Sequence, residues 1–558
     1  MRISFVPSSA FVVLLMTVVT LHRAAPALSA QSAPRLTGGS RANIDVLHYE
    51  FRIDFPSRSA LDTIRFAATT TARRTGAVSV LSLDLVATLH VDSTFVNGVR
   101  SPFTRPGDSV NVALPAGAMD TVRVKIFYSG VPTDGLIIRH DSAGSWTAFG
   151  DNFPDRARQW LATVDHPSDK ALVDWIVRAP ATHRVIANGD RIEESLEPGV
   201  TTTPMVRTHW RTIRPIYTAV MVIGVAPFAV LELGDTACGL AERVGCVRQS
   251  IWTSPEQRAV MPGNFARAGE IVALFSTLVG PFPYEKLAHV ASSTRYGGME
   301  NAGAIFYAEN LFKPGSPTES LIAHETAHQW FGDAVTEREW SHVWLSEGFA
   351  TYFAALWTEH AHGDSAFRHD LSNMRTKVLK SAITGQKPVI DEGLDNVARV
   401  LNTNVYEKAG FTLHLLRREI GDSAFFRGIR AYYAAHRHGN ALTADLQRAF
   451  EQTSGRTLDW FFAQWMRRPG VAELNATWHW DSTRKRVVVA VVQGSQFAPY
   501  KLSLTVDVVD AKGATKRVRV AVPAALTSSI TIPLTSAPHS LVFDADVSLL
   551  GTIRSSRR

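Results

Sequence analysis

The stretch SPTESLIAHETAHQWFGD, residues 316–333, contains two histidines four positions apart, with a glutamate directly after the first one. Ser316 can cap a helix, Pro317 suits a first helical position, and Glu319 completes a capping box. The residues that follow predict a helix that runs to Gly332, a residue type common at helix C-termini.

The two histidines of this helix have the spacing of metal ligands. His324 and His328 project from one helical face, so their neutral imidazoles can share a tetrahedral Zn²⁺. Glu325 is rotated by about 100° from His324, which places it beside the metal and suits a base that activates water. Taken alone, the pattern is also compatible with an amphipathic helix that carries two polar histidines.

A third ligand candidate follows in VWLSEGFATYFAALW, where Glu347 is separated from His328 by eighteen residues. This second segment is helix-like and apolar on most faces, and a carboxylate buried there is costly unless it is paired or bound to metal. Two histidines and one glutamate, with a position left for water, form a catalytic rather than a structural zinc set. The sequence therefore predicts a zinc hydrolase.

The N-terminus predicts export. Arg2 precedes the apolar run FVVLLMTVVTL and the small residues of RAAPALSA, which is the pattern of a signal peptide over residues 1–30. About eleven apolar residues are too few to cross a bilayer, so no stable membrane insertion is expected after cleavage. The expected location is secreted or periplasmic, where Cys238 and Cys246 could close a disulfide or remain free thiols.

The distribution of charge and the alternation of apolar residues predict the binding partners and the domain organisation. The formal net charge of +7 falls largely on strand-like segments near the C-terminus, so no nucleic-acid partner is expected. Alternating strands indicate an antiparallel β domain over residues 40–235. Helical spacing dominates residues 236–470, the expected catalytic zinc domain, and alternation returns over 471–552 as a small β-sandwich. The predicted fold class is multidomain α+β.

Several motifs resemble the zinc aminopeptidases of the aminopeptidase N type, which include the leukotriene hydrolase and aminopeptidase B branch. The H-E-x-x-H pattern with its downstream glutamate matches, and so does YGGMEN at residues 296–301. Further resemblance is found in DVLHYEFRID, VIANGD, YEKAG and DWFFAQWMRRPGVAEL. The resemblance covers roughly residues 44–550 and implies a thermolysin-like catalytic domain that binds one Zn²⁺ per chain through His324, His328 and Glu347.

The resemblance also implies the remaining site residues. Glu300 would hold the free α-ammonium of a peptide through charge-assisted hydrogen bonds. Glycines leave the backbone accessible, so a substrate could add as a strand beside them. Tyr406 would donate a hydrogen bond to the oxyanion, and Glu325 would act as the base. The substrate-binding residues implied by the motif are Gly297, Gly298, Met299, Glu300 and Asn301.

Two features depart from the family pattern. Phe153 stands where the family has a second amine anchor, and neither of the neighbouring polar residues, Asp151 and Asn152, is assigned to that role. Ser346 replaces the asparagine that precedes the glutamate ligand. The chain ends at Arg558, which leaves no room for the large helical C-terminal domain common in the family. A more open cleft, or one closed by another subunit, is therefore expected.

The expected function is an exported zinc aminopeptidase that hydrolyses the first bond of peptides with a free N-terminus. A zinc endopeptidase with the same ligands is one alternative, and the ammonium-binding role of Glu300 discriminates between them. A non-catalytic peptide-binding protein is another alternative. Epoxide hydrolysis, found in one branch of the family, is compatible with the same residues.

Overall fold

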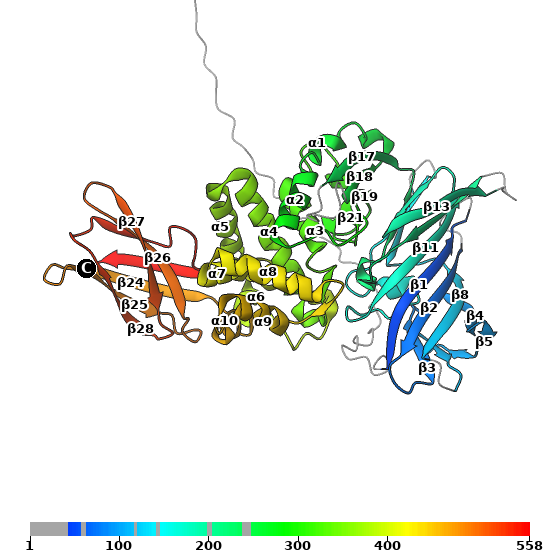
Figure 1. Ribbon diagram of the computed structural model, residues 1–558, viewed down its shortest axis with the longest axis horizontal. Coiled ribbons are helices and arrows are strands. Elements are labelled where there is room, and N and C mark those ends of the chain that lie inside the picture. The colour runs from blue at the N-terminus through cyan, green and yellow to red at the C-terminus, as the bar shows by residue number, and fades with distance from the viewer. Residues whose placement is uncertain (1–42, 57–62, 117–119, 141–144, 198–203, 237–246) are drawn as a thin grey trace, which may run out of the picture.

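The computed structural model describes residues 43–56, 63–116, 120–140, 145–197, 204–236 and 247–558. A β domain, a mainly helical domain and a second β domain follow one another along the long axis of the molecule (Figure 1). This arrangement confirms the predicted multidomain α+β fold. The signal peptide predicted for residues 1–30, and the cysteines Cys238 and Cys246, lie outside the described residues.

The N-terminal domain is built on a nine-stranded sheet in the order β13-β14-β11-β1-β2-β8-β4-β5, with β15 paired to β11. Its pairs are antiparallel as predicted, except that β1 and β11 run parallel. The strands of this sheet are β1 (Ile44–Asp54), β2 (Ile64–Arg74), β4 (His90–Val96), β5 (Val99–Arg100), β8 (Thr121–Gly130), β11 (Lys170–Pro180), β13 (Asp190–Glu197), β14 (Met205–Arg211) and β15 (Ile216–Tyr217).

Two smaller sheets complete this domain. One has the order β12-β16-β10-β9 and the other β3-β7-β6. Their strands are β3 (Val80–Asp84), β6 (Phe103–Thr104), β7 (Ser109–Ala113), β9 (Leu136–His140), β10 (Trp146–Gly150), β12 (Arg184–Ala187) and β16 (Ile223–Ala226). The short segment after β10 leads toward the functional site.

The helical domain begins with a mixed five-stranded sheet in the order β17-β18-β19-β21-β20. Its strands are β17 (Ala229–Thr236), β18 (Val247–Thr253), β19 (Lys286–Ser292), β20 (Gly298–Met299) and β21 (Ala304–Ala308). The boundary predicted at 235–236 falls at the end of β17, a strand that pairs with β18 and so belongs to this sheet. The alternation of apolar and polar residues does not separate β17 from the preceding strands, because the strands of both domains repeat every two residues.

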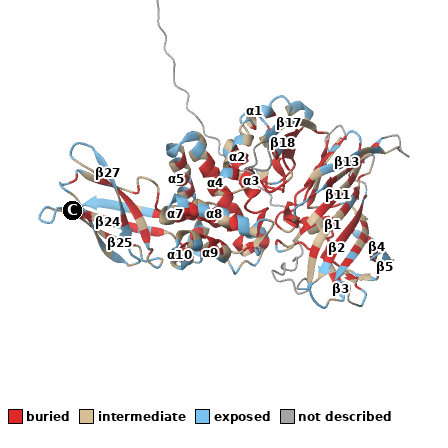
Figure 2. Cartoon of the chain, viewed as in Figure 1, coloured by how far each residue is buried: buried red, intermediate tan, exposed pale blue. Residues whose placement is uncertain are grey.

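The sheet is followed by the helices that carry most of the predicted site. The helices of the domain are α1 (Met261–Asn264), α2 (Ala268–Leu278), α3 (Glu319–His328), α4 (Trp344–His362), α5 (Asp364–Lys380), α6 (Ala382–Gln386), α7 (Ala409–Ile420), α8 (Asp422–His436), α9 (Thr443–Ser454) and α10 (Asp459–Met466). The short strands β22 (Val335–Glu337) and β23 (Gly439–Ala441) pair in parallel. Helices α3 and α4 pack against each other and are largely buried (Figure 2).

The start of α3 differs from the prediction. Its N-cap is Thr318, whose hydroxyl accepts the backbone N–H of Leu321 at 3.3 Å, whereas Ser316 and Pro317 precede the helix. Glu319 is the first helical residue, so it does not complete a capping box. Regular α-helix ends at His328, and the chain then turns at Gly332, whose φ is 115°. Thr318 caps better because its hydroxyl reaches the third helical N–H directly.

The C-terminal domain consists of two facing sheets, in the orders β28-β25-β24-β30 and β27-β26-β29. Its strands are β24 (Ala472–Asp481), β25 (Arg486–Gln493), β26 (Leu502–Val509), β27 (Thr515–Val522), β28 (Thr527–Pro533), β29 (Ser540–Phe543) and β30 (Gly551–Arg557). Across the described ranges, no helix combines the length and apolar character needed to cross a membrane.

Candidate metal centre and substrate site

Three donor atoms converge where α3 meets α4. Nε2 of His324 lies 3.2 Å from Nε2 of His328, and each lies 3.4 Å from Oε2 of Glu347. Zinc bonds of about 2.0–2.1 Å in a tetrahedron separate neighbouring donors by about 3.3 Å. The three side chains therefore have the spacing of a mononuclear zinc site, and they form one of the candidate metal groups in the described part of the chain.

The electrostatics of these donors also fit a cation. Although burial opposes it, the neighbouring imidazoles lower the pKa of Glu347 to about 2, so this group is a carboxylate. Its Oε2 is buried and has no hydrogen-bond partner among the described residues. Glu300 and Glu325 are buried nearby, each 4–5% exposed. Three carboxyl groups around two imidazoles need a positive charge to offset the cost of burial.

Two residues that the sequence analysis did not assign hold the site in place. The Ser346 hydroxyl lies 3.0 Å from Nδ1 of His328, which leaves Nε2 of that ring for the metal. Gln329 donates to the Glu300 carbonyl at 2.8 Å and accepts from the Gly303 N–H at 2.8 Å. Each is a sequence neighbour of a predicted ligand, and Ser346 also departs from the family pattern at its position.

The motif GGMEN lies at the sheet edge nearest α3. Strand β20 ends the five-stranded sheet, so it offers free backbone groups on one side, as the substrate-strand hypothesis requires. Gly298, Met299 and Glu300 line the same cavity as the metal donors. Gly297 and Asn301 do not line it, and Asn301 is fully buried.

Gly298 has a structural role that its position in the motif did not reveal. A Cβ added there would overlap the side chain of Glu325, whereas a Cβ at Gly297 would come no closer than 3.9 Å to Leu311. Position 298 is therefore a glycine because the carboxylate of the predicted base packs directly against its backbone.

We expect Gly298→Ala to lower kcat/KM by at least about tenfold, because displacing the base by an ångström is costly to catalysis. Gly297→Ala is the matched control and should retain activity close to that of the parent enzyme. Steady-state kinetics on a single aminoacyl substrate distinguish the two. Equal losses in both variants would show that the contact with Glu325 is unimportant.

Tyr406 reaches the site from a π-helical turn, Asn404–Lys408, that leads into α7. Its hydroxyl donates to Oε1 of Glu347 at 2.8 Å and lines the cavity. Burial and the Glu347 carboxylate raise the pKa of Tyr406 well above its ordinary value. The phenol is therefore protonated and remains a hydrogen-bond donor at the edge of the metal group.

The same turn contains a buried lysine, Lys408, which is 0% exposed. Its ammonium group makes a single hydrogen bond among the described residues, to the Arg468 carbonyl at 3.4 Å. Burial, and then the charge of Arg468, lower the pKa of Lys408 from 10.5 to about 7. The unfolded chain thus binds more protons than the folded one between these two pH values, and stability attributable to this group rises with pH across that window.

We expect Lys408→Met to stabilise the fold most below about pH 7, by up to about 5 kcal/mol, and least above pH 10. Urea unfolding of both proteins at several pH values measures the difference. A stability gain that does not change with pH would mean that Lys408 is not the group that titrates.

A wall of apolar side chains closes the other side of the cavity. Phe153 is 3% exposed and meets Tyr296 and Trp340 edge to face, with ring centroids 6.2 and 5.3 Å apart. The cavity has a volume of about 40 Å³ and also includes Leu401 in its lining. The position of the family's second amine anchor is thus occupied by an apolar ring in contact with the site.

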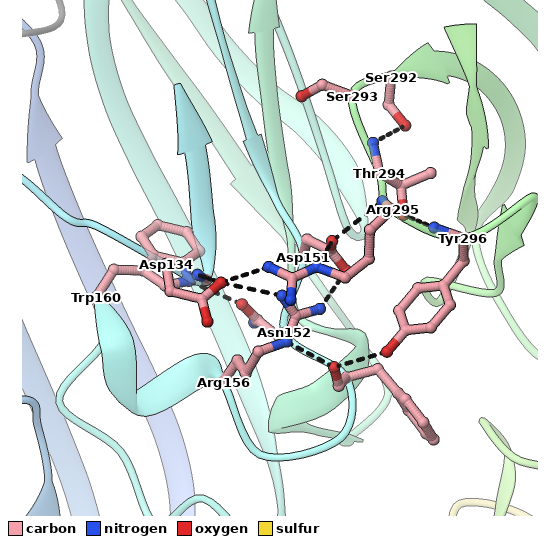
Figure 3. A network of polar contacts seen from close by, with 12 residues as sticks. Asp134, Asp151, Asn152, Arg156, Trp160, Ser292, Ser293, Thr294, Arg295 and Tyr296 are labelled. Carbon is pink, nitrogen blue, oxygen red and sulfur yellow. Dashed lines mark hydrogen bonds and ion pairs between the residues drawn. The ribbon is translucent and has the colours of Figure 1, made fainter. Parts of the chain in front are cut away.

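Neither neighbour of Phe153 replaces that anchor. Asp151 is fully buried and bound by Arg156 at 2.8 Å and Arg295 at 3.3 Å, as Figure 3 shows. The amide of Asn152 bonds the carbonyls of Thr218 and Met221. Both side chains are fully used in hydrogen bonds and ion pairs within the protein. Glu300 is therefore the remaining candidate for binding an ammonium group.

Several known proteins are similar to this chain. Residues 268–465 match the model of the peptidase family M1 domain. Aminopeptidase N of Streptomyces lividans is 27% identical over 362 residues, which cover 59% of this chain and 39% of that protein. Tricorn protease-interacting factor F2 of Thermoplasma acidophilum is 27% identical over 455 residues, covering 77% and 54%. The chain thus spans about half or less of the length of these curated relatives.

This chain matches almost the whole length of one relative whose structure is solved. The M1 zinc metallopeptidase of Deinococcus radiodurans, determined as a mutant bound to a Tyr-Ser-Ala substrate, is 25% identical, with a TM-score of 0.66. The match covers 77% of this chain and 96% of that structure. Residues 268–465 are therefore a peptidase family M1 domain, similar to that of aminopeptidase N and of M1 zinc metallopeptidases, and they form most of the helical domain that carries the metal-donor group.

Proposed function

We propose that this protein is a zinc aminopeptidase that releases the first residue of peptides with a free N-terminus. The observation that carries the proposal is the position of Glu300, a buried carboxylate that shares a cavity with the three metal donors. A buried carboxylate there recognises a cationic α-amino group and excludes chains that extend past it. The Tyr-Ser-Ala substrate of the Deinococcus radiodurans relative is a peptide of this class.

The metal ligands and Glu325 have separate roles in the proposed reaction. When bound by His324, His328 and Glu347, zinc supplies Lewis-acid chemistry that polarises a carbonyl and acidifies water. Glu325 accepts the proton of the attacking water and later delivers it to the departing amine. Burial raises the pKa of Glu325 well above its ordinary value, which suits a group that must both take and return a proton.

Two further groups act on the substrate itself. Glu300 holds the α-ammonium, so the first peptide bond lies beside the metal group. Tyr406 donates a hydrogen bond to the oxygen on which negative charge develops. With Phe153 at the position of a second carboxylate or amide, Glu300 supplies most of the recognition of the ammonium group.

A panel of aminoacyl-fluorophore substrates tests the proposal, with each assay repeated after treatment with a zinc chelator and again after zinc is restored. Activity that the chelator removes and zinc restores is expected, together with no cleavage of the N-acetylated analogues. Cleavage of N-acetylated peptides at internal bonds would instead indicate an endopeptidase. Absence of all activity in the zinc-loaded protein would favour a peptide-binding role.

We further propose that the protein is exported to the periplasm or secreted. The proposal rests on Arg2, the apolar run at residues 11–21 and the small residues that follow. Expression with and without residues 1–30, followed by fractionation and N-terminal sequencing, tests it. Full-length protein that stays in the cytoplasm with an intact N-terminus would contradict export.

A further inference from the structure

A second cavity lies between the N-terminal domain and the five-stranded sheet, and the proposed reaction does not use it. Its volume is about 230 Å³. Strands β12, β13 and β14 line it from the N-terminal domain, and β17, β18 and β19 line it from the M1 side. A volume of this size holds far more than one water molecule, for which about 10–15 Å³ suffices.

The floor of this cavity contains a buried cation. Lys286 is 3% exposed, and its ammonium group donates to the carbonyls of Ala187 at 2.8 Å and Gly303 at 3.2 Å. It makes no ion pair with a carboxylate in the described part of the chain. Burial lowers the pKa of Lys286 to about 8. At neutral pH a buried positive charge whose hydrogen-bond partners are only carbonyls favours an anion beside it.

The walls and rim of the cavity strengthen the preference for an anion. Arg184, on the exposed rim, makes no ion pair among the described residues, whereas Arg248 is paired with Asp190 at 3.0 Å. Glu232 is the single acidic residue of the lining, and it is exposed. Two cations without carboxylate partners, one on the floor and one on the rim, therefore face the same space.

Two tryptophans give the cavity an aromatic side. Trp210 and Trp252 meet edge to face with ring centroids 6.3 Å apart, and the Lys286 ammonium lies 5.1 Å from the Trp210 ring centroid. Nε1 of Trp210 is buried and has no hydrogen-bond partner in the described residues. Because this N–H is buried, Trp210 offers the cavity ring surface and not a hydrogen-bond donor.

We propose that this cavity is a binding site for a small organic anion, a phosphate or carboxylate attached to a flat apolar group. The anionic group contacts Lys286 and Arg184, and the apolar part packs against Trp210 and Trp252. Since the lining comes from two domains, the bound molecule bridges them. Binding to the folded state alone then raises thermal stability as the ligand concentration rises.

Isothermal titration calorimetry on the zinc-loaded full chain tests this proposal with phenyl phosphate, benzoate, inorganic phosphate and phenol. Phenyl phosphate or benzoate should bind saturably and raise Tm, and phenol, which lacks the anionic group, should not. The stronger of the two aromatic anions identifies phosphate or carboxylate as the preferred group. Inorganic phosphate should bind more weakly, because it leaves the tryptophan side of the cavity unfilled.

Variants distinguish this cavity from the metal centre, which can also attract anions. Arg184→Gln and Lys286→Met should each weaken binding by about tenfold or more, since each removes a charge-assisted hydrogen bond. Arg100→Gln, on the exposed strand β5, is the matched control and should bind as the parent does. Arg184 is exposed, so its variant tests the site even if Lys286→Met fails to fold. No saturable binding of either aromatic anion, or binding equal in Arg184→Gln and the parent, would overturn the proposal.

Discussion

Replacing Glu325 with glutamine is expected to reduce kcat by about 10³-fold or more while zinc stays bound. Glutamine keeps the size and shape of the side chain, so it fits against Gly298 as the glutamate does. It cannot accept a proton from water, and general-base catalysis contributes about 10²–10⁴-fold to such reactions. The three donor side chains are unchanged, so metal affinity should be largely retained.

Two measurements are needed on the same preparation of Glu325→Gln. Metal analysis should give one zinc per chain, and steady-state kinetics on an aminoacyl-fluorophore should give the loss in kcat. Glu347→Ala provides the contrasting case, because it should lose the metal together with activity. Near-parental kcat in Glu325→Gln with zinc present would exclude Glu325 as the base.

Replacing Glu300 with glutamine is expected to lower kcat/KM by about 10–100-fold for substrates with a free amino group. The change removes the charge from a hydrogen bond to an ammonium, an interaction that contributes about 1.5–3 kcal/mol. The expected loss lies toward the upper end, because Phe153 stands where a second anchor would share this role and Asp151 is bound by arginines.

An exposed carboxylate of the same domain serves as the control. Glu309 pairs with Arg139 at 2.7 Å and does not line the catalytic cavity, so Glu309→Gln should leave kcat/KM unchanged. Kinetics with a free and an N-acetylated form of one peptide complete the test. If Glu300→Gln and the parent cleave free peptides equally well, the amino group is recognised elsewhere.

Local residue patterns were enough to predict the fold class and the three metal donors. His324 and His328 are four residues apart on one helix, and that geometry is set by the helical repeat alone. Glu347 was predicted because an apolar helix rarely buries a carboxylate without a partner. The same kind of local reasoning was wrong about the cap of α3, where Thr318 rather than Ser316 holds the first turn.

Other features depend on groups that are distant in the chain. Gly298 lies against Glu325, Ser346 orients His328, and residues of six strands line the cavity around Lys286. Each of these contacts joins segments whose separation along the chain carries no periodic signal. The helix dictated which atoms could bind a metal, because its repeat is local. The packing of sheet against helix and of domain against domain dictated what surrounds those atoms, because burial and close approach exist only after the chain has folded.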